Sequence, residues 1–259
     1  MSIHPPIRAR LAERFLFNFR MPPAAMSRYM PEPWLTPQVI NGYGVASFCI
    51  LHLRNITYAP LPTVFGVHSI SSAPRIAVID RSRGQRDPAV FVTYRQTNSL
   101  FGAWYTKSWS APHPLVESAI EHVSAGETKV SIYSRLGELQ FAATVRPAAW
   151  LDSALFASTD DFSAFIAQGV SSYGYSRYGR RLTKFDLHKH DMGYDVLQAL
   201  GVSGSAIASW LSDGATLDSA FHTSGGEYEW TYHGLTAKQS TRLIAATNAA
   251  ICAREIREG

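Results

Sequence analysis

Residues 99–109, SLFGAWYTKSW, place Lys107 among several aromatic side chains. A lysine in such surroundings either extends its ammonium to water along a ring or loses its charge through burial. If this stretch is a strand, Tyr105 and Lys107 point to the same face, about 7 Å apart. We therefore treat Lys107 as a candidate for covalent catalysis and Tyr105 as a group that orients a ligand or donates a proton. The solvated interpretation of Lys107 stays open.

A second candidate group is the pair of histidines in DLHKHD, residues 186–191. On a strand, Asp186, His188 and His190 share one face, and zinc or iron uses such ligands when a further ligand or an open position exists. Neutral histidines also act as hydrogen-bonding groups without a metal. We expect no metal, and we take His188 as a pocket residue that gives or accepts a proton. A metal-dependent enzyme that uses His188 and His190 is kept as an alternative.

Arginines and tyrosines form a third group. Inside a mostly apolar barrel, Arg75 and Arg95 would bind a carboxylate in bidentate fashion, with Tyr94 orienting the rest of the ligand. Trp104 is added to this binding group, and His68 lies in the loop before Arg75, from which it would close over a pocket. The alternative is that these arginines are solvated at strand ends, as most are.

The remaining composition disfavours several function classes. The formal net charge of +4 comes from scattered basic residues, so we expect no nucleic-acid partner. We expect no membrane partner either, because no run of eighteen apolar residues and no signal peptide is present. Two cysteines, Cys49 and Cys252, indicate a reducing compartment, and we expect a cytoplasmic protein. The sequence also lacks a Gly-x-Ser-x-Gly elbow and a phosphate-binding loop.

Most of the elements that would position these residues have the composition of strands. We predict strands over 41–58, 104–111, 181–191 and 226–234, and hairpins over 75–95 and 128–147. Helices are predicted over 22–34, 158–170 and 236–258, with short helical pieces within 195–211. No repeat or linker divides the chain, so we expect one domain over residues 1–259 that ends in the helix 236–258. The fold class is mainly β, a large curved sheet or barrel with a few helices.

The order of these segments resembles an uncharacterised branch of the acetoacetate decarboxylase-like superfamily. The resemblance covers roughly residues 10 to 235, and its motifs are ERFLFNFRMPPAAMSRYMPEPW, PRIAVIDRSRGQRDPAVFV, LFGAWY and DFSAFIAQGVSSYGYS followed by LHKHDMGYDVLQA. The superfamily implies a cone-shaped antiparallel β-barrel with peripheral helices, a small-molecule pocket and a homo-oligomer. It implies no cofactor.

In the decarboxylases of this superfamily, a lysine in a Gly-aromatic-Pro-Lys motif forms a Schiff base with a β-keto acid. Gly102 matches the glycine of that motif, and Tyr105 falls on the lysine position. Arg75 matches an arginine of the hairpin, but no carboxylate stands around Ser71, where relatives can carry one.

Three hypotheses follow. The first is a small-molecule enzyme that acts on an oxo or carboxylic acid in a barrel pocket, with decarboxylation or a related lyase step as the candidate chemistry. The second is a non-catalytic protein that binds a small molecule on the same barrel. The third is the metal-dependent enzyme.

Overall fold

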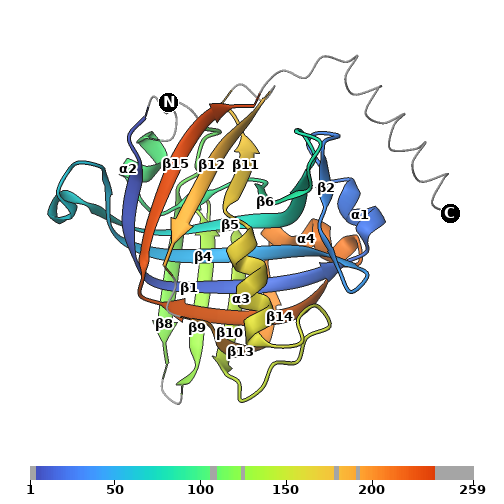
Figure 1. Cartoon of the computed structure of the whole chain (residues 1–259). Coiled ribbons are helices and arrows are strands. Elements are labelled where there is room, and N and C mark those ends of the chain that lie inside the picture. The colour runs from blue at the N-terminus through green and yellow to red at the C-terminus, as the bar shows by residue number, and fades with distance from the viewer. Residues whose placement is uncertain (1–3, 106–109, 124–125, 178–180, 191–192, 237–259) are drawn as a thin grey trace.

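A computed structural model of the chain describes residues 4–105, 110–123, 126–177, 181–190 and 193–236 (Figure 1). The C-terminal helix expected over 236–258 lies almost wholly outside these residues. Within the described part of the chain, no helix has the length and apolar character needed to cross a membrane.

Strands make up most of the described chain. In chain order they are β1 (Ile7–Met21), β2 (Leu35–Pro37), β3 (Val39–Ile40), β4 (Tyr43–Tyr58), β5 (Val67–Asp80), β6 (Asp87–Val92), β7 (Gln96–Thr97), β8 (Val116–His122), β9 (Thr128–Ser134), β10 (Leu139–Pro147), β11 (Ser171–Tyr175), β12 (Leu182–Lys189), β13 (Asp195–Ser203), β14 (Thr216–Ser224) and β15 (Glu227–Leu235). The helices are α1 (Pro23–Ser27), α2 (Leu100–Tyr105), α3 (Thr159–Gln168) and α4 (Ser205–Ser212), with a 3₁₀ turn η1 (Thr63–Phe65).

Seven of these strands close into a hydrogen-bonded ring. Their order is β4-β5-β6-β11-β12-β15-β1, and β1 pairs back onto β4 from Ile7 to Met21. All these pairings are antiparallel except that of β6 with β11. The other edge of β1 also carries β14, from which β13, β10, β9 and β8 continue the sheet. In Figure 1, β12 and β15 cross in front of β4 and β5.

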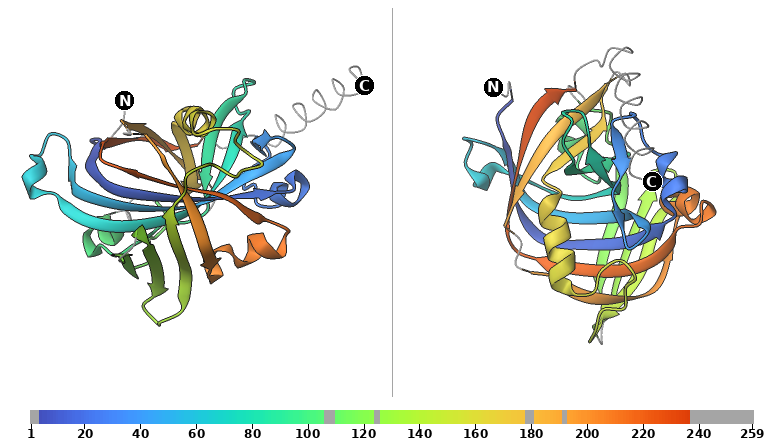
Figure 2. Two further views of the ribbon diagram at one scale, coloured as in Figure 1. Left: turned by 90° about the horizontal axis from the view of Figure 1, so that it is seen from below. Right: turned by 45° about the vertical axis from the view of Figure 1, so that its right-hand side comes forward.

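The long central strands bury both of their faces. One face of β1 places Phe15, Phe17 and Phe19 in a large aromatic core, while the other places Leu11 and Leu16 in a second core inside the ring. Helix α3 covers part of this second core, where the ring of Phe162 stacks on that of Phe221. Helices α1 and α4 lie together at the end of the molecule away from α2 (Figure 2).

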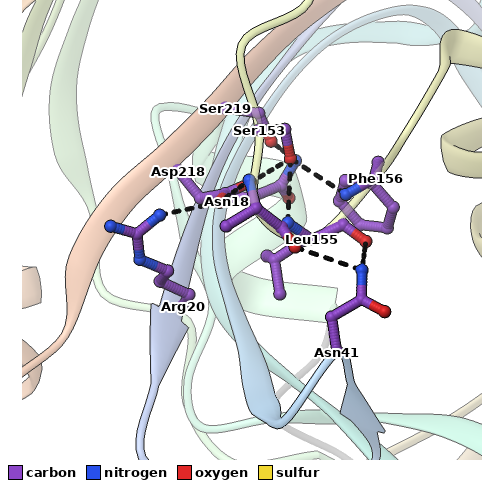
Figure 3. Close-up of polar contacts among 9 residues, drawn as sticks. Asn18, Arg20, Asn41, Ser153, Leu155, Phe156, Asp218 and Ser219 are labelled. Atoms are coloured by element: carbon purple, nitrogen blue, oxygen red, sulfur yellow. Dashed lines mark hydrogen bonds and ion pairs between the residues drawn. The ribbon is translucent and has the colours of Figure 1, made fainter.

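A buried carboxylate anchors the segment that leads into α3 (Figure 3). The side chain of Asp218 on β14 is fully buried and accepts hydrogen bonds from the Ser153 hydroxyl and from the Ala154 amide at 2.8 Å. Arg20 on β1 lies 3.5 Å from the same carboxylate. Asn41 in the β3–β4 turn donates to the Ala154 carbonyl at 3.1 Å, so the loop is bonded both to β14 and to this turn.

The mainly β fold predicted from the sequence is confirmed, and two local predictions are wrong. Trp104 and Tyr105, predicted as the start of a strand over 104–111, instead end helix α2, whose first turn is capped because the Ser99 hydroxyl accepts the Gly102 amide at 3.2 Å. Residues 195–203 form strand β13 instead of helical pieces, because they pair with β10 and β14. Only the part after Gly204 is helical, as α4.

Candidate functional site

A cavity of about 210 Å³ lies on the inner face of the ring, bordered by β4, β5, β6, β11, β12, β15 and α2. Its polar lining consists of Thr57, Tyr58, Ser69, Ser71, Ser72, Arg75, Arg95, Gln96, Thr97, Ser110, His113 and Ser172. Its apolar lining includes Ile7, Cys49, Leu51, Leu53, Ile56, Val67, Val90, Val92, Phe101, Phe185, Leu187 and Trp230. The described lining contains no aspartate, glutamate or lysine.

Strand alternation places Arg75 in this cavity. Successive side chains of a strand point to opposite faces, so Val67, Ser69, Ser71, Ala73 and Arg75 of β5 all face inward. Of the residues between them, Ile70 packs against the large aromatic core on the other side of the sheet, while Ser72 also borders the cavity.

The Arg75 guanidinium lies below the protein surface without a counter-ion among the described residues. Its Nε atom is buried and has no hydrogen-bond partner. Burial lowers the pKa of Arg75 from its ordinary value, and the neighbouring Arg14 cation lowers it further. An arginine remains protonated even so, which leaves a buried positive charge with unused donors.

Arg95 is the second cation of the cavity. Burial and the nearby Arg75 lower the pKa of Arg95 to about 10, so it too stays charged at neutral pH. Its guanidinium lies 5.6 Å from the centroid of the Phe185 ring, and Nη1 passes so close to Gly174 that a Cβ there would stand 2.8 Å away. Because Gly174 has no side chain, it leaves space for the Arg95 guanidinium beside β11.

His113 lies beside this arginine pair, and the sequence analysis did not identify it. Burial, with a smaller effect of the Arg95 charge, lowers the pKa of His113 to about 3. The imidazole is thus neutral at pH 7, and its buried Nε2 has no hydrogen-bond partner. Its sequence context, APHP, is irregular and carries no periodic signal that would place it in a pocket.

Hydroxyl groups line the cavity around Ser71, where no carboxylate stands. The Ser69 hydroxyl lies 2.7 Å from those of both Ser71 and Thr97, and the Ser71 hydroxyl donates to Thr97 at 3.2 Å. Beside them, Ser72 donates to Gln96 at 3.1 Å. The three hydroxyls form a closed set, because each can donate to another member.

The other candidate binding residues are placed differently from the two arginines. Tyr94 is half-buried, and burial raises its pKa to about 12, but it does not line the cavity. His68 is exposed and Trp104 is 68% exposed, and neither lines the cavity.

The three catalytic candidates belong to different segments of the chain. Tyr105 is the last residue of α2 and not part of a strand. Lys107 lies outside the described residues. His188 is exposed and borders a separate hollow between α3 and β12.

The metal-ligand group kept as an alternative at DLHKHD does not form in the part of the chain that the structure describes. No three His, Cys, Asp or Glu side chains there are grouped so that they could hold a metal ion. Asp186 instead accepts from the Ser171 hydroxyl at 2.7 Å and lies 2.8 Å from Nε2 of His233.

The arrangement suits an anion. Two partly buried guanidinium groups without a described carboxylate attract a carboxylate, or an oxyanion that develops during a reaction, in a cavity where water competes less than at an open surface. A cationic ligand would meet only repulsion from these charges.

Comparison with solved structures identifies the fold. The chain is similar to an acetoacetate decarboxylase from Legionella pneumophila, with a TM-score of 0.65 and 13% identity over 91% of this chain and 89% of that one. It is also similar to the enduracididine biosynthesis enzyme MppR in complex with the condensation product of pyruvate and imidazole 4-carboxaldehyde (TM-score 0.62, 13% identity, 91% and 90% covered). An acetoacetate decarboxylase-like enzyme from Sphingomonas wittichii matches at a TM-score of 0.60 and 11% identity, with 90% and 92% covered. No family model and no curated protein sequence matches the chain. The fold is thus acetoacetate decarboxylase-like, as the resemblance of the sequence predicted.

Proposed function

We propose that this chain is an enzyme of the acetoacetate decarboxylase-like type that binds a small oxo or carboxylic acid in the cavity. The observation that carries the proposal is the pair of partly buried cations, Arg75 and Arg95, which line the cavity and have no ion-pair partner among the described residues. The condensation product of pyruvate bound by the structural neighbour MppR supports an oxo acid as the substrate class.

A lyase step fits these charges. When a 3-oxo acid loses carbon dioxide, the carbon–carbon bond to the carboxylate breaks and its electron pair forms an enolate. The enolate oxygen gains negative charge, which the guanidinium groups of Arg75 and Arg95 stabilise, and the enolate carbon then takes a proton from water. His113, neutral and beside Arg95, is positioned to hydrogen-bond the same ligand.

A covalent version of this step uses Lys107. Its amine would condense with the keto group to an imine, releasing water, and the imine nitrogen would then accept the electron pair. Tyr105 would orient the ligand or donate a proton. Borohydride reduction with candidate keto acids tests this version, because reduction fixes the ligand on Lys107 as a mass increase that a Lys107→Met variant lacks. No adduct on the wild-type chain removes the covalent version and leaves the electrostatic one.

The anion site is tested by titrating 2-oxo and 3-oxo acids into the wild type and into Arg75→Gln and Arg95→Gln variants. Charged hydrogen bonds of this kind contribute on the order of tenfold or more to affinity. We expect each variant to weaken binding at least about tenfold. Arg86→Gln, which alters an exposed arginine in the β5–β6 turn, is the matched control and should bind as the wild type does. Equal affinities in all four proteins would refute the assignment.

The second candidate function is a non-catalytic binding protein on the same barrel. It is favoured by one observation, the absence of a lysine among the described residues that line the cavity. It predicts saturable binding of the acid with no release of carbon dioxide or other product. Detection of turnover that Arg75→Gln abolishes would rule it out.

Self-association and a cytoplasmic location remain predictions of the sequence analysis. We propose that the chain forms a homo-oligomer, which light scattering of the purified protein tests. A mass equal to that of one chain would contradict it.

A further inference from the structure

The polarity of the cavity changes along one strand. The inward-facing residues of β5 run from Val67 through Ser69, Ser71 and Ala73 to Arg75. Eight residue steps of strand span roughly 26 Å along the backbone. The lined region is therefore much longer than a three- or four-carbon acid, and its two ends differ in chemistry.

The two cations both lie at the Arg75 end. Val92 of β6 pairs with Arg75 on one side and with Gly174 of β11 on the other. The Arg95 guanidinium lies against Gly174, so both arginines are at the same end of the cavity. Among the described lining residues no other side chain carries a charge at neutral pH, because His113 is neutral.

The opposite end is mainly apolar. Ile56 of β4 pairs with Val67, and Ile7 of β1 pairs with both Tyr58 and Trp230, so these side chains surround the cavity where β5 begins. Thr57 and Tyr58 add two hydroxyl groups to this end but no charge. The neighbouring η1 turn continues this character at the surface, where Phe65 is 77% exposed.

The part of the cavity between these two ends does not require a polar group on the ligand. On β4, Leu51 and Leu53 lie opposite Ser71 and Ser69. The hydroxyls of Ser69, Ser71 and Thr97 already bond to one another, so an apolar chain can pass them without leaving a hydroxyl unpaired. Water in the apolar end would find few partners and is readily displaced by such a chain.

We propose that the ligand is an elongated amphiphilic acid. Its carboxylate or oxo-acid head lies against Arg75 and Arg95, and its alkyl or aryl tail lies along β4 and β5 toward Val67. This inference rests on the proposed function for the position of the head and adds the substrate class.

Isothermal titration with unbranched carboxylates and 2-oxo acids of increasing length tests the proposal. Each methylene moved from water into an apolar site tightens binding about two- to fourfold. We expect this gain to continue to about eight carbons, since such a chain is shorter than the lined strand. A dissociation constant that stays flat beyond four carbons would overturn the inference while leaving the proposed function intact. If no acid of any length binds, the proposed function itself fails.

A pair of variants locates the tail. Val67→Phe fills the apolar end, so it should abolish the gain from chain length while short acids bind as they do to the wild type, which also shows that the variant is folded. Val39→Phe makes the same change at a 49% exposed valine on β3 and should keep the gain. An unchanged chain-length dependence in Val67→Phe would place the tail elsewhere and overturn the proposal.

Discussion

His113 links the interior of the cavity to the stability of the protein. Its pKa is about 3 in the folded chain, against an ordinary value of 6.5 when unfolded. Between these values the unfolded state binds a proton that the folded state does not bind, so stability falls as the pH falls. The slope approaches about 1.4 kcal/mol per pH unit below pH 6.5 and ends near the folded pKa.

We therefore expect His113→Asn to flatten the loss of unfolding free energy between pH 7 and pH 5, as measured by urea denaturation. His68→Asn, a change at an exposed histidine outside the cavity, should leave that slope as in the wild type. Identical slopes for His113→Asn and the wild type would mean that this imidazole is protonated within the fold.

Gly174 gives a second prediction at the scale of one atom. A Cβ at this position would stand 2.8 Å from Nη1 of Arg95, which is the far end of a flexible side chain. Gly174→Ala should therefore displace the guanidinium more than the backbone and weaken acid binding on the order of tenfold. Gly201→Ala, on β13 with nothing within 4 Å of the added carbon, is the matched control. If both variants bind the acid with equal affinity, Arg95 does not contact the ligand.

The sequence identified some of these residues and not others for physical reasons. Arg75 and Arg95 stand beside apolar strand segments, and a charge in such a pattern is visible in the sequence alone. Whether the guanidinium finds a carboxylate is not visible, because that depends on strands far away in the chain. His113 lies in an irregular segment without periodicity, so its burial follows only from tertiary packing.

At the scale of elements, α2 depends on its cap. The Ser99 hydroxyl accepts the Gly102 amide, and the helix brings Phe101 and Gly102 to the cavity. Ser99→Ala should cost about 1 kcal/mol of unfolding free energy and also weaken acid binding. Ser158→Ala removes the equivalent cap of α3, whose Oγ accepts the Asp161 amide at 3.1 Å. It should cost a similar free energy and leave binding unchanged. Equal binding by both variants would show that α2 does not shape the site.

Whether a segment forms a helix or a strand was predictable where one sequence signal, such as a cap or a turn, dominated. Ser158 and the acidic residues after it marked α3, and turn residues marked the hairpin of β5 and β6. Strand β1 was not predicted, although its two ends, IRARL and FNFRM, alternate between apolar and polar residues. Only from Arg14 to Phe19 are both of its faces buried, and there the alternation is interrupted by Leu16. Helix α2 was missed because its aromatic residues have the composition of a strand.

The whole molecule is closed by contacts between distant parts of the chain. The ring requires β1 to pair with β4 on one edge and with β15 and β14 on the other, at separations of up to about two hundred residues. Local propensity does not specify such pairings. The strand-rich sequence therefore predicted only a large curved sheet or barrel, and the cone-shaped antiparallel barrel was predicted from the family resemblance. Because the ring shares its strands between both cores, we expect it to unfold as one cooperative unit.

Asp218 tests that cooperativity, since its buried carboxylate joins β14 to β1 and to the segment before α3. Asp218→Ala leaves the Ala154 amide and the Arg20 guanidinium without their acceptor, which should lower the unfolding free energy by about 2 to 3 kcal/mol. Urea unfolding followed by circular dichroism and by tryptophan fluorescence should still give one coincident transition at a lower midpoint. Glu229→Ala breaks the partly exposed pair with Arg8 and should cost less than about 1 kcal/mol. Two separate transitions in Asp218→Ala would mean that the α3 segment and the ring fold independently, and the site would then rest on the ring alone.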